Sequence, residues 1–144
     1  MLKVAKFGGS SVAGAEQFRK VRAIVEADDS RRIVVASAAG KRSGDDHKLT
    51  DLLYLIHAHL TYGVSCDEIL QTVEQRLLSI RDELDIPVDI AAELAAFRRL
   101  SKDTSVDEIV SRGEYFTSKL LAAYLGYAFV DAADCVFFAA VREA

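Results

Sequence analysis

The sequence has few of the residues that build disulfide frameworks and metal centres. It contains two cysteines, Cys66 and Cys135, far apart among 144 residues. Cytosolic proteins keep their thiols reduced, so we expect both to be free. The three histidines are His47, His57 and His59, and no cysteine or histidine follows them at the spacing of metal ligands. We therefore expect surface histidines and no metal site.

Long apolar runs and an excess of basic residues are also missing. No apolar run approaches the ~20 residues that cross a bilayer, and the start of the chain lacks the pattern of a signal peptide. The formal net charge of −4 offers no broad attraction for nucleic acid or anionic lipid. With 51% hydrophobic and 28% charged residues, the composition is typical of a globular domain with a core. We expect a cytoplasmic protein without nucleic-acid or membrane partners.

The first third of the chain has the pattern of an α/β protein. An apolar run over 2–7 predicts a buried strand that ends at a pair of glycines, and a second run over 33–37 predicts another strand. Between them, helical spacing predicts a helix. The order strand, turn, helix, strand is typical of a βαβ unit with a parallel sheet. The expected core face of this helix is Phe18, Val21, Ile24 and Val25.

A polar loop over 38–48 follows, and then helical patterns dominate. A connection of this length between a strand and a helix is often functional. Ser65 with Glu68, and Ser105 with Glu108, have the spacing of capping boxes that open helices. We interpret the region of about 64–104 as a helical insertion whose role is packing or a subunit contact. The predicted helices are 49–60, 65–84, 90–97 and 105–125, and the predicted closing strands are 127–130 and 136–138.

The sharpest local motif is KFGGSS at 6–11. Lys6 stands at the end of a predicted strand, and Gly8, Gly9 and Ser10 lead toward a helix. Glycines let backbone N–H groups approach an anion, while the lysine and the helix N-terminus add positive charge. The motif is therefore consistent with a phosphate cradle, although a plain tight turn explains the spacing equally well.

The sequence does not contain either of two better-known nucleotide-binding motifs. The P-loop requires a glycine five residues before its Gly-Lys pair, but Val35 stands there, and Arg42 occupies the place of its serine or threonine. The adjacent glycines of the first motif do not fit the spacing of a dinucleotide-binding fingerprint.

A second candidate segment is SRGE at 111–114. Gly113 falls on the apolar arc of a predicted helix, where a glycine costs ~1 kcal/mol relative to alanine. Close approach of another backbone or of a ligand would offset that cost. Glu114 lies at the edge of the arc, where a carboxylate either pairs with a cation or reaches water. Thr50 and Asp51, at the start of another predicted helix, could simply cap it.

In this order, these segments resemble the aspartokinases, a branch of the amino-acid kinase family. The opening motif resembles the aspartokinase signature, and the segments around the polar loop and around Gly113 resemble the second and third motifs. Asp51 departs from the family pattern, where asparagine is common, and the polar loop is longer and more charged than in many members. The matching segments are KFGGSS at 6–11, SA at 37–38, GKR at 40–42, LTDLL at 49–53, SRGE at 111–114 and FVDA at 129–132.

The resemblance implies a fold and a reaction. The fold is an α/β three-layer sandwich with a mainly parallel sheet, the carbamate kinase-like fold. The reaction transfers the γ-phosphate of magnesium ATP to the side-chain carboxylate of L-aspartate, the first step toward lysine, threonine and methionine. The enzymes have no tightly bound cofactor, and we expect a homo-oligomer.

The resemblance also assigns roles to individual residues. Lys6 would bind and neutralise the transferring phosphoryl group, with Gly40 close to the same phosphates. Thr50 would help to hold aspartate, and Glu114 would pair with the ammonium group of aspartate. The cradle would be formed by Gly8, Gly9 and Ser10.

Family members are much longer than this chain. We therefore expect residues 1–144 to form the N-terminal, substrate-side half of a catalytic domain, without the ATP-binding half or regulatory domains, and to be inactive alone. The apolar run over 137–141 is consistent with a cut edge. Two alternatives remain open: a related kinase acting on glutamate or acetylglutamate, and a noncatalytic module that binds an anion or an amino acid.

Overall fold

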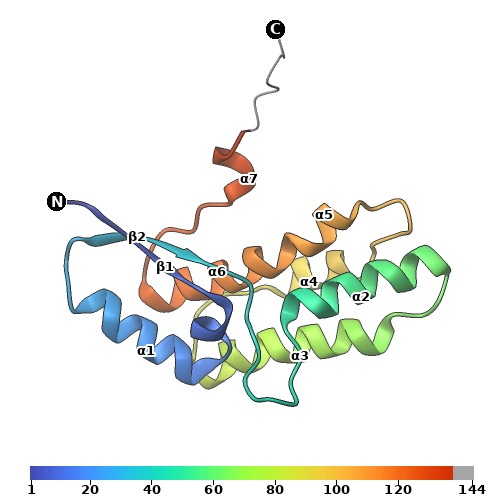
Figure 1. Ribbon diagram of the computed structural model, residues 1–144, viewed down its shortest axis with the longest axis horizontal. Coiled ribbons are helices and arrows are strands. Elements are labelled where there is room, and N and C mark those ends of the chain that lie inside the picture. The colour runs from blue at the N-terminus through green and yellow to red at the C-terminus, as the bar shows by residue number, and fades with distance from the viewer. Residues whose placement is uncertain (138–144) are drawn as a thin grey trace, which may run out of the picture.

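The computed structural model describes residues 1–137 and has the predicted βαβ start (Figure 1). Strands β1 (Lys3–Phe7) and β2 (Arg31–Ala36) pair in parallel, with Phe7 opposite Ala36 at the end of the ladder. The 3₁₀-helix η1 (Gly9–Val12) and helix α1 (Ala15–Glu26) connect them. The prediction of an α/β fold with a parallel sheet is confirmed.

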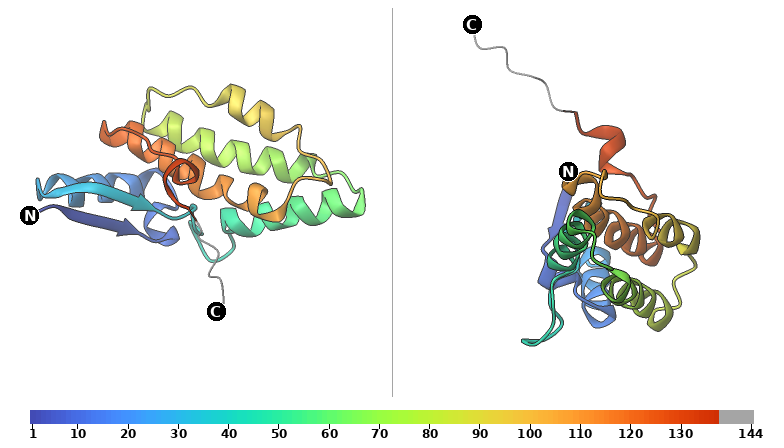
Figure 2. Two further views of the ribbon diagram at one scale, coloured as in Figure 1. Left: turned by 90° about the horizontal axis from the view of Figure 1, so that it is seen from above. Right: turned by 90° about the vertical axis from the view of Figure 1, so that its right-hand side faces the viewer.

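The helices between β2 and residue 125 form a layer that extends beyond one end of the sheet (Figures 1 and 2). They are α2 (Leu49–Tyr62), α3 (Asp67–Glu83), α4 (Ala91–Phe97), α5 (Val106–Val110) and α6 (Arg112–Leu125). Helix α7 (Ala132–Cys135) lies apart from this layer. Within it, α2, α3 and α6 pack against one another, and α6 also packs against β2. Helix α6 therefore joins the helical layer to the sheet.

The two strands are less buried than we predicted. Val4 is 61% exposed, and its neighbour across the ladder, Ile33, is 45% exposed. Within residues 1–137 the sheet has two strands, and these side chains share a face that no described helix covers. Ile24 is likewise exposed and not in the core. The 3.6-residue period places it at the outer edge of the stripe formed by Phe18, Val21 and Val25.

Two helix ends are as predicted. Gly63 and Gly126 end α2 and α6 in the left-handed region, with φ of 68° and 71°. Ser105 caps α5, because its hydroxyl oxygen accepts a hydrogen bond from the Glu108 N–H group (3.2 Å). The predicted helix over 105–125 is divided at Ser111 into α5 and α6.

The capping box at Ser65 was wrong. Cys66 is the N-cap of α3 and makes no side-chain capping bond. The Ser65 hydroxyl donates instead to the carboxylate of Asp67 (3.0 Å). The oxygen of this hydroxyl accepts a hydrogen bond from the Asp67 N–H group (3.4 Å), and not from the Glu68 N–H group that the spacing predicted.

The predicted closing strand over 127–130 was also wrong. These residues are irregular, because a strand needs a hydrogen-bonded neighbour and β1 and β2 pair only with each other within residues 1–137. The Tyr127 hydroxyl donates to the carbonyl of Arg31 (3.2 Å) and ties the segment to β2. Of the strand predicted over 136–138, residues 136 and 137 are irregular, and residue 138 lies outside the described residues.

Cysteines and histidines largely follow expectation. Cys66 is buried and Cys135 exposed, and both are free. His47 is exposed, whereas His57 and His59 are half-buried on α2. Among the described residues, no helix is both long and apolar enough to cross a membrane.

Gly113 lies at a close contact between helix α6 and the rest of the core. A Cβ atom at this position would lie 2.8 Å from the Cβ of Ala38 and 3.1 Å from a methyl carbon of Leu53. Real Cβ atoms do not approach other carbons to 2.8 Å. The glycine marks a close approach, but its neighbours are the side chains of Ala38 and Leu53 and not the backbone or ligand that we predicted.

Gly113→Ala tests this packing. We expect it to lower the free energy of unfolding by about 1–3 kcal/mol, because the added methyl overpacks the core by more than the ~1 kcal/mol gained in helix propensity. Gly44→Ala is the matched control, since its Cβ would meet no atom within 4 Å. Urea titration of both variants provides the measurement. Stabilisation by Gly113→Ala would contradict the contact.

Candidate active site

Residues 38–40, which follow β2, form a buried junction where the candidate motifs meet. Ala38 and Ala39 are 6% and 1% exposed, and Gly40 is buried as well. The Gly40 N–H group donates to the carbonyl oxygen of Gly9 at 2.7 Å. The first glycine motif and the start of the polar loop are therefore joined through their main chains.

Only glycine fits on either side of this contact. A Cβ atom at Gly9 would lie 2.9 Å from the carbonyl oxygen of Ala38, and one at Gly40 would lie 2.6 Å from the carbonyl carbon of Gly9. Both neighbours are backbone atoms, which cannot rotate away. The two glycines are thus explained by close approach of two loops at the carboxyl end of the sheet.

Two further motifs reach the same junction. The Ala39 carbonyl accepts a hydrogen bond from the Leu49 N–H group (2.9 Å), which fixes the start of α2. The Ala39 N–H group donates to the hydroxyl of Thr117 on α6 (3.2 Å). One turn before Thr117, Gly113 packs on Ala38. The segments at 6–11, 40–42, 49–53 and 111–114 therefore converge on residues 38–40.

Arg76, which was not predicted from the sequence, reaches this junction from α3. Its guanidinium donates to the carbonyl oxygens of Gly40 and His47, and it lies 3.4 Å from the carboxylate of Asp46. Hydrogen bonds from Arg42 hold the pKa of Asp46 well below its usual range. Burial lowers the pKa of Arg76, whose side chain is only 3% exposed.

A sequence signal for Arg76 was present. It lies on the stripe of α3 that also carries Val73, Leu77 and Ile80, all buried. A cation on an apolar stripe requires partners, so it points to a polar contact across the core. The same argument applies to Thr117, which lies four residues from both Gly113 and Leu121 on α6.

The side chains with predicted roles lie mostly at the surface. Lys6 is exposed at the penultimate position of β1, and Gly8, Ser10 and Glu114 are exposed as well. Thr50 is half-buried in the first turn of α2. Side chains on the surface beside a buried backbone junction are available to a ligand.

Two local details differ from expectation. The helix expected directly after the glycines is the 3₁₀-helix η1, and α1 begins only at Ala15. Thr50 and Asp51 do not cap α2, because its N-cap is Lys48 and no side chain makes the capping bond. Capping therefore does not account for Thr50.

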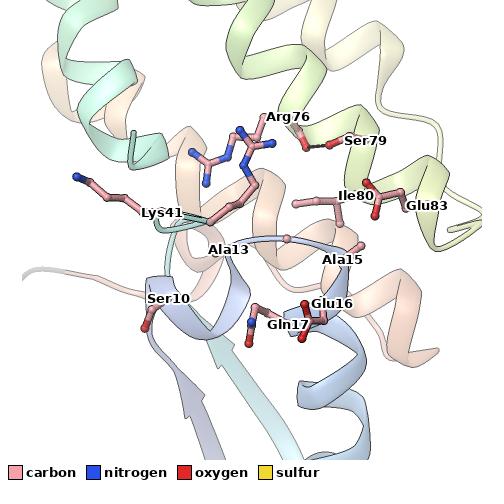
Figure 3. A pocket seen from close by; sticks show the side chains of 12 residues that line it. Ser10, Ala13, Ala15, Glu16, Gln17, Lys41, Arg76, Ser79, Ile80 and Glu83 are labelled. Carbon is pink, nitrogen blue, oxygen red and sulfur yellow. Dashed lines mark hydrogen bonds between the residues drawn. The ribbon is translucent and has the colours of Figure 1, made fainter. Parts of the chain in front are cut away.

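A cleft of about 240 Å³ lies between the start of α1 and helix α3 (Figure 3). Arg42 and Arg76 line the cleft together with Glu16 and Glu83, so its lining has mixed charge. Of the predicted site residues, Ser10 alone lines it. The cleft therefore neighbours the junction but is distinct from the surface that carries Lys6. Within residues 1–137, no group of three or more histidine, cysteine or acidic side chains could hold a metal ion.

Comparison with known proteins gives the class. The sequence profile of the amino acid kinase family matches residues 1–143, and the chain belongs to that family. Its curated relatives include aspartokinases. It is 37% identical over 138 residues to aspartokinase 3 of Bacillus subtilis, and 30% identical over 136 residues to the chloroplastic aspartokinase 2 of Arabidopsis thaliana. These matches cover 91% and 85% of this chain, but only 30% and 24% of the relatives.

Solved structures agree. The aspartate kinase of Clostridium acetobutylicum matches with a TM-score of 0.85 and 44% identity, over 90% of this chain and 30% of that one. Aspartokinase III of E. coli, in complex with aspartate and ADP, matches with a TM-score of 0.69 and 29% identity. That match covers 88% of this chain and 29% of that one. The predicted aspartokinase-type fold is confirmed.

Proposed function

We propose that this chain provides the phosphate cradle and the aspartate-side wall of an aspartate kinase. The single observation that carries the proposal is the main-chain contact between Gly9 and Gly40, with the exposed Lys6 on the adjoining strand end. The similarity to aspartokinases, one of them solved with aspartate and ADP, supports the choice of substrates. The reaction converts ATP and L-aspartate into ADP and aspartyl phosphate.

This arrangement suits the reaction chemically. A carboxylate attacks phosphorus without a general base, so the protein has to align donor and acceptor and neutralise charge on the transferring group. In the proposal, Lys6 supplies the charge, while Gly8, Gly9 and Ser10 supply closely spaced backbone N–H groups. Gly40 brings the second loop against the same phosphates.

On the acceptor side, Thr50 and Glu114 are proposed to bind aspartate. They belong to α2 and α6, whose first turns both reach the 38–40 junction. Glu114 follows the glycine that sets the depth of α6 in the core. An exposed carboxylate at that point is available to the substrate ammonium group.

The remaining parts of the proposal concern the form of ATP, the location of the enzyme and its domain organisation. ATP is used as its magnesium complex, which neutralises the phosphates. The enzyme acts in the cytoplasm, in biosynthesis of the aspartate-derived amino acids, and as a homo-oligomer. Residues 1–144 form the N-terminal part of its catalytic domain, with residues 64–104 as a helical insertion, and the nucleotide-base pocket and regulatory domains lie outside them.

The direct test is acyl phosphate formation by the full-length gene product. Hydroxylamine traps aspartyl phosphate as a hydroxamate, and the assay is run in parallel with aspartate, glutamate and acetylglutamate. We expect hydroxamate from aspartate with ATP, and little from the other two acids. A preference for glutamate or acetylglutamate would assign another amino-acid kinase, and no product from any acid would favour a binding module.

Lys6→Ala tests the phosphate assignment. We expect kcat to fall by at least ~100-fold, in the range found when one preorganised charge stabiliser is removed. Lys3→Ala, on the same strand but pairing with Asp28, is the control and should retain near-native turnover. Steady-state assays on both variants provide the comparison. More than a tenth of native turnover in Lys6→Ala would refute the role.

Glu114→Gln tests the aspartate assignment while preserving side-chain shape. Loss of a charged hydrogen bond worth about 1.5–3 kcal/mol should raise the KM for aspartate roughly 10- to 100-fold. The KM for ATP should stay nearly unchanged. Glu108→Gln, an exposed carboxylate on α5, is the control. Equal losses for both substrates would indicate a structural role for Glu114.

A further inference from the structure

Arg76 is the one charged side chain among residues 1–137 that is fully buried. It lies among apolar neighbours on α3, and placing a cation there costs several kcal/mol of lost hydration before any partner is counted. Replacing a buried ion pair by an apolar side chain of similar size is often neutral or stabilising. Packing alone therefore does not explain an arginine at this position.

The partners of the Arg76 guanidinium all belong to one loop. Its two terminal nitrogens donate to the main-chain carbonyls of Gly40 and His47, which are the two ends of the 40–48 loop. The carboxylate of Asp46, near the second end, lies 3.4 Å from the same guanidinium. The planar fork of an arginine holds its donors in fixed directions, which suits two separate carbonyls and a facing carboxylate at once.

The loop has internal support, but that support does not join its two ends. Asp46 accepts hydrogen bonds from the backbone and side chain of Arg42, which closes a small ring inside the loop. The ends themselves are held by the bond between Leu49 and Ala39, by the bond between Gly40 and Gly9, and by Arg76. Of these, the Leu49–Ala39 bond joins the residues that flank the loop, and Arg76 is the side chain that bonds to both ends of the loop.

We propose that Arg76 is a positioning residue that closes the 40–48 loop and so keeps the Gly40 main chain against Gly9. It contacts no substrate, and its effect passes through the Gly40 carbonyl. The proposal rests on the proposed function, because the Gly9–Gly40 contact matters to catalysis only if it holds phosphate. It also assigns a role to the 64–104 region, from which the sequence suggested only packing or a subunit contact.

The first test measures the loop itself, without activity. Hydrogen exchange of peptides covering 38–49 is compared in the full-length protein and its Arg76→Met and Arg76→Lys variants. We expect exchange in this segment to rise about tenfold or more in Arg76→Met, with α1 unchanged. Arg76→Lys retains the charge but lacks the rigid planar fork, so a smaller rise is expected. This variant serves if Arg76→Met does not fold.

The control is Arg98→Met. Arg98 pairs with Glu74, which lies on α3 as Arg76 does, and the nitrogen–oxygen distances are 2.6 Å. Arg98 is exposed and lies far from the 40–48 loop in sequence. This variant removes an arginine contact to α3 without touching the 40–48 loop. Its exchange and kinetics should match those of the native protein.

The second test is kinetic. A misplaced Gly40 should raise the KM for ATP by at least about tenfold, and more than the KM for aspartate, because Thr50 remains fixed by α2. A purely structural role would reduce the amount of folded enzyme, which lowers the apparent kcat but leaves KM unchanged. Native exchange over 38–49, or a native KM for ATP, in a folded Arg76→Met variant overturns the proposal.

The two proposals fail in different ways. If the native protein makes no acyl phosphate from aspartate, the proposed function is wrong, while the exchange comparison still decides whether Arg76 closes the loop. If the native protein is an aspartate kinase and Arg76→Met keeps the native KM for ATP, the positioning role alone is wrong.

Discussion

The rest of the structure depends on how the main chain of residues 38–40 is held. Its N–H and carbonyl groups make hydrogen bonds to four residues from different parts of the chain: Gly9, Leu49, Thr117 and Arg76. A buried backbone without such partners would lose hydrogen bonds to water and gain none. The contact at Gly113 then sets how closely α6 approaches. One short segment therefore fixes the relative positions of the sheet, α2, α3 and α6.

The features that the sequence predicted correctly depend on residues close together in the chain or on steric fit. The parallel βαβ start follows from an apolar run, a helical stripe and a second run, and Gly63 and Gly126 end their helices where a left-handed residue is needed. A glycine on the apolar arc of α6 predicted a close approach, and Ala38 and Leu53 supply it. What failed depended on distant partners. Residues 127–130 have strand-like composition, but no described strand pairs with them.

The candidate site shows the same division. The motifs located Lys6, the glycine pair, Gly40 and Glu114, but periodicity could not show that Gly9 and Gly40 touch. Arg76 and Thr117 were not predicted, because the helical period was read from apolar residues alone. Both lie on buried stripes, where a polar side chain needs a partner. Their partners, the Gly40 carbonyl and the Ala39 N–H group, are 36 and 78 residues away.

The division of labour between backbone and side chains matches the proposed chemistry. Phosphoryl transfer to a carboxylate needs no buried acid or base, so the proposed reaction does not require Lys6 or Glu114 to be buried. It has to hold backbone N–H groups and a few charges in fixed places. The chain does this by burying the 38–40 main chain, together with Thr117 and Arg76, and by leaving Lys6 and Glu114 at the surface. Rigidity thus resides in residues that contact no substrate in the proposal, and the residues proposed to contact substrate carry little of the packing.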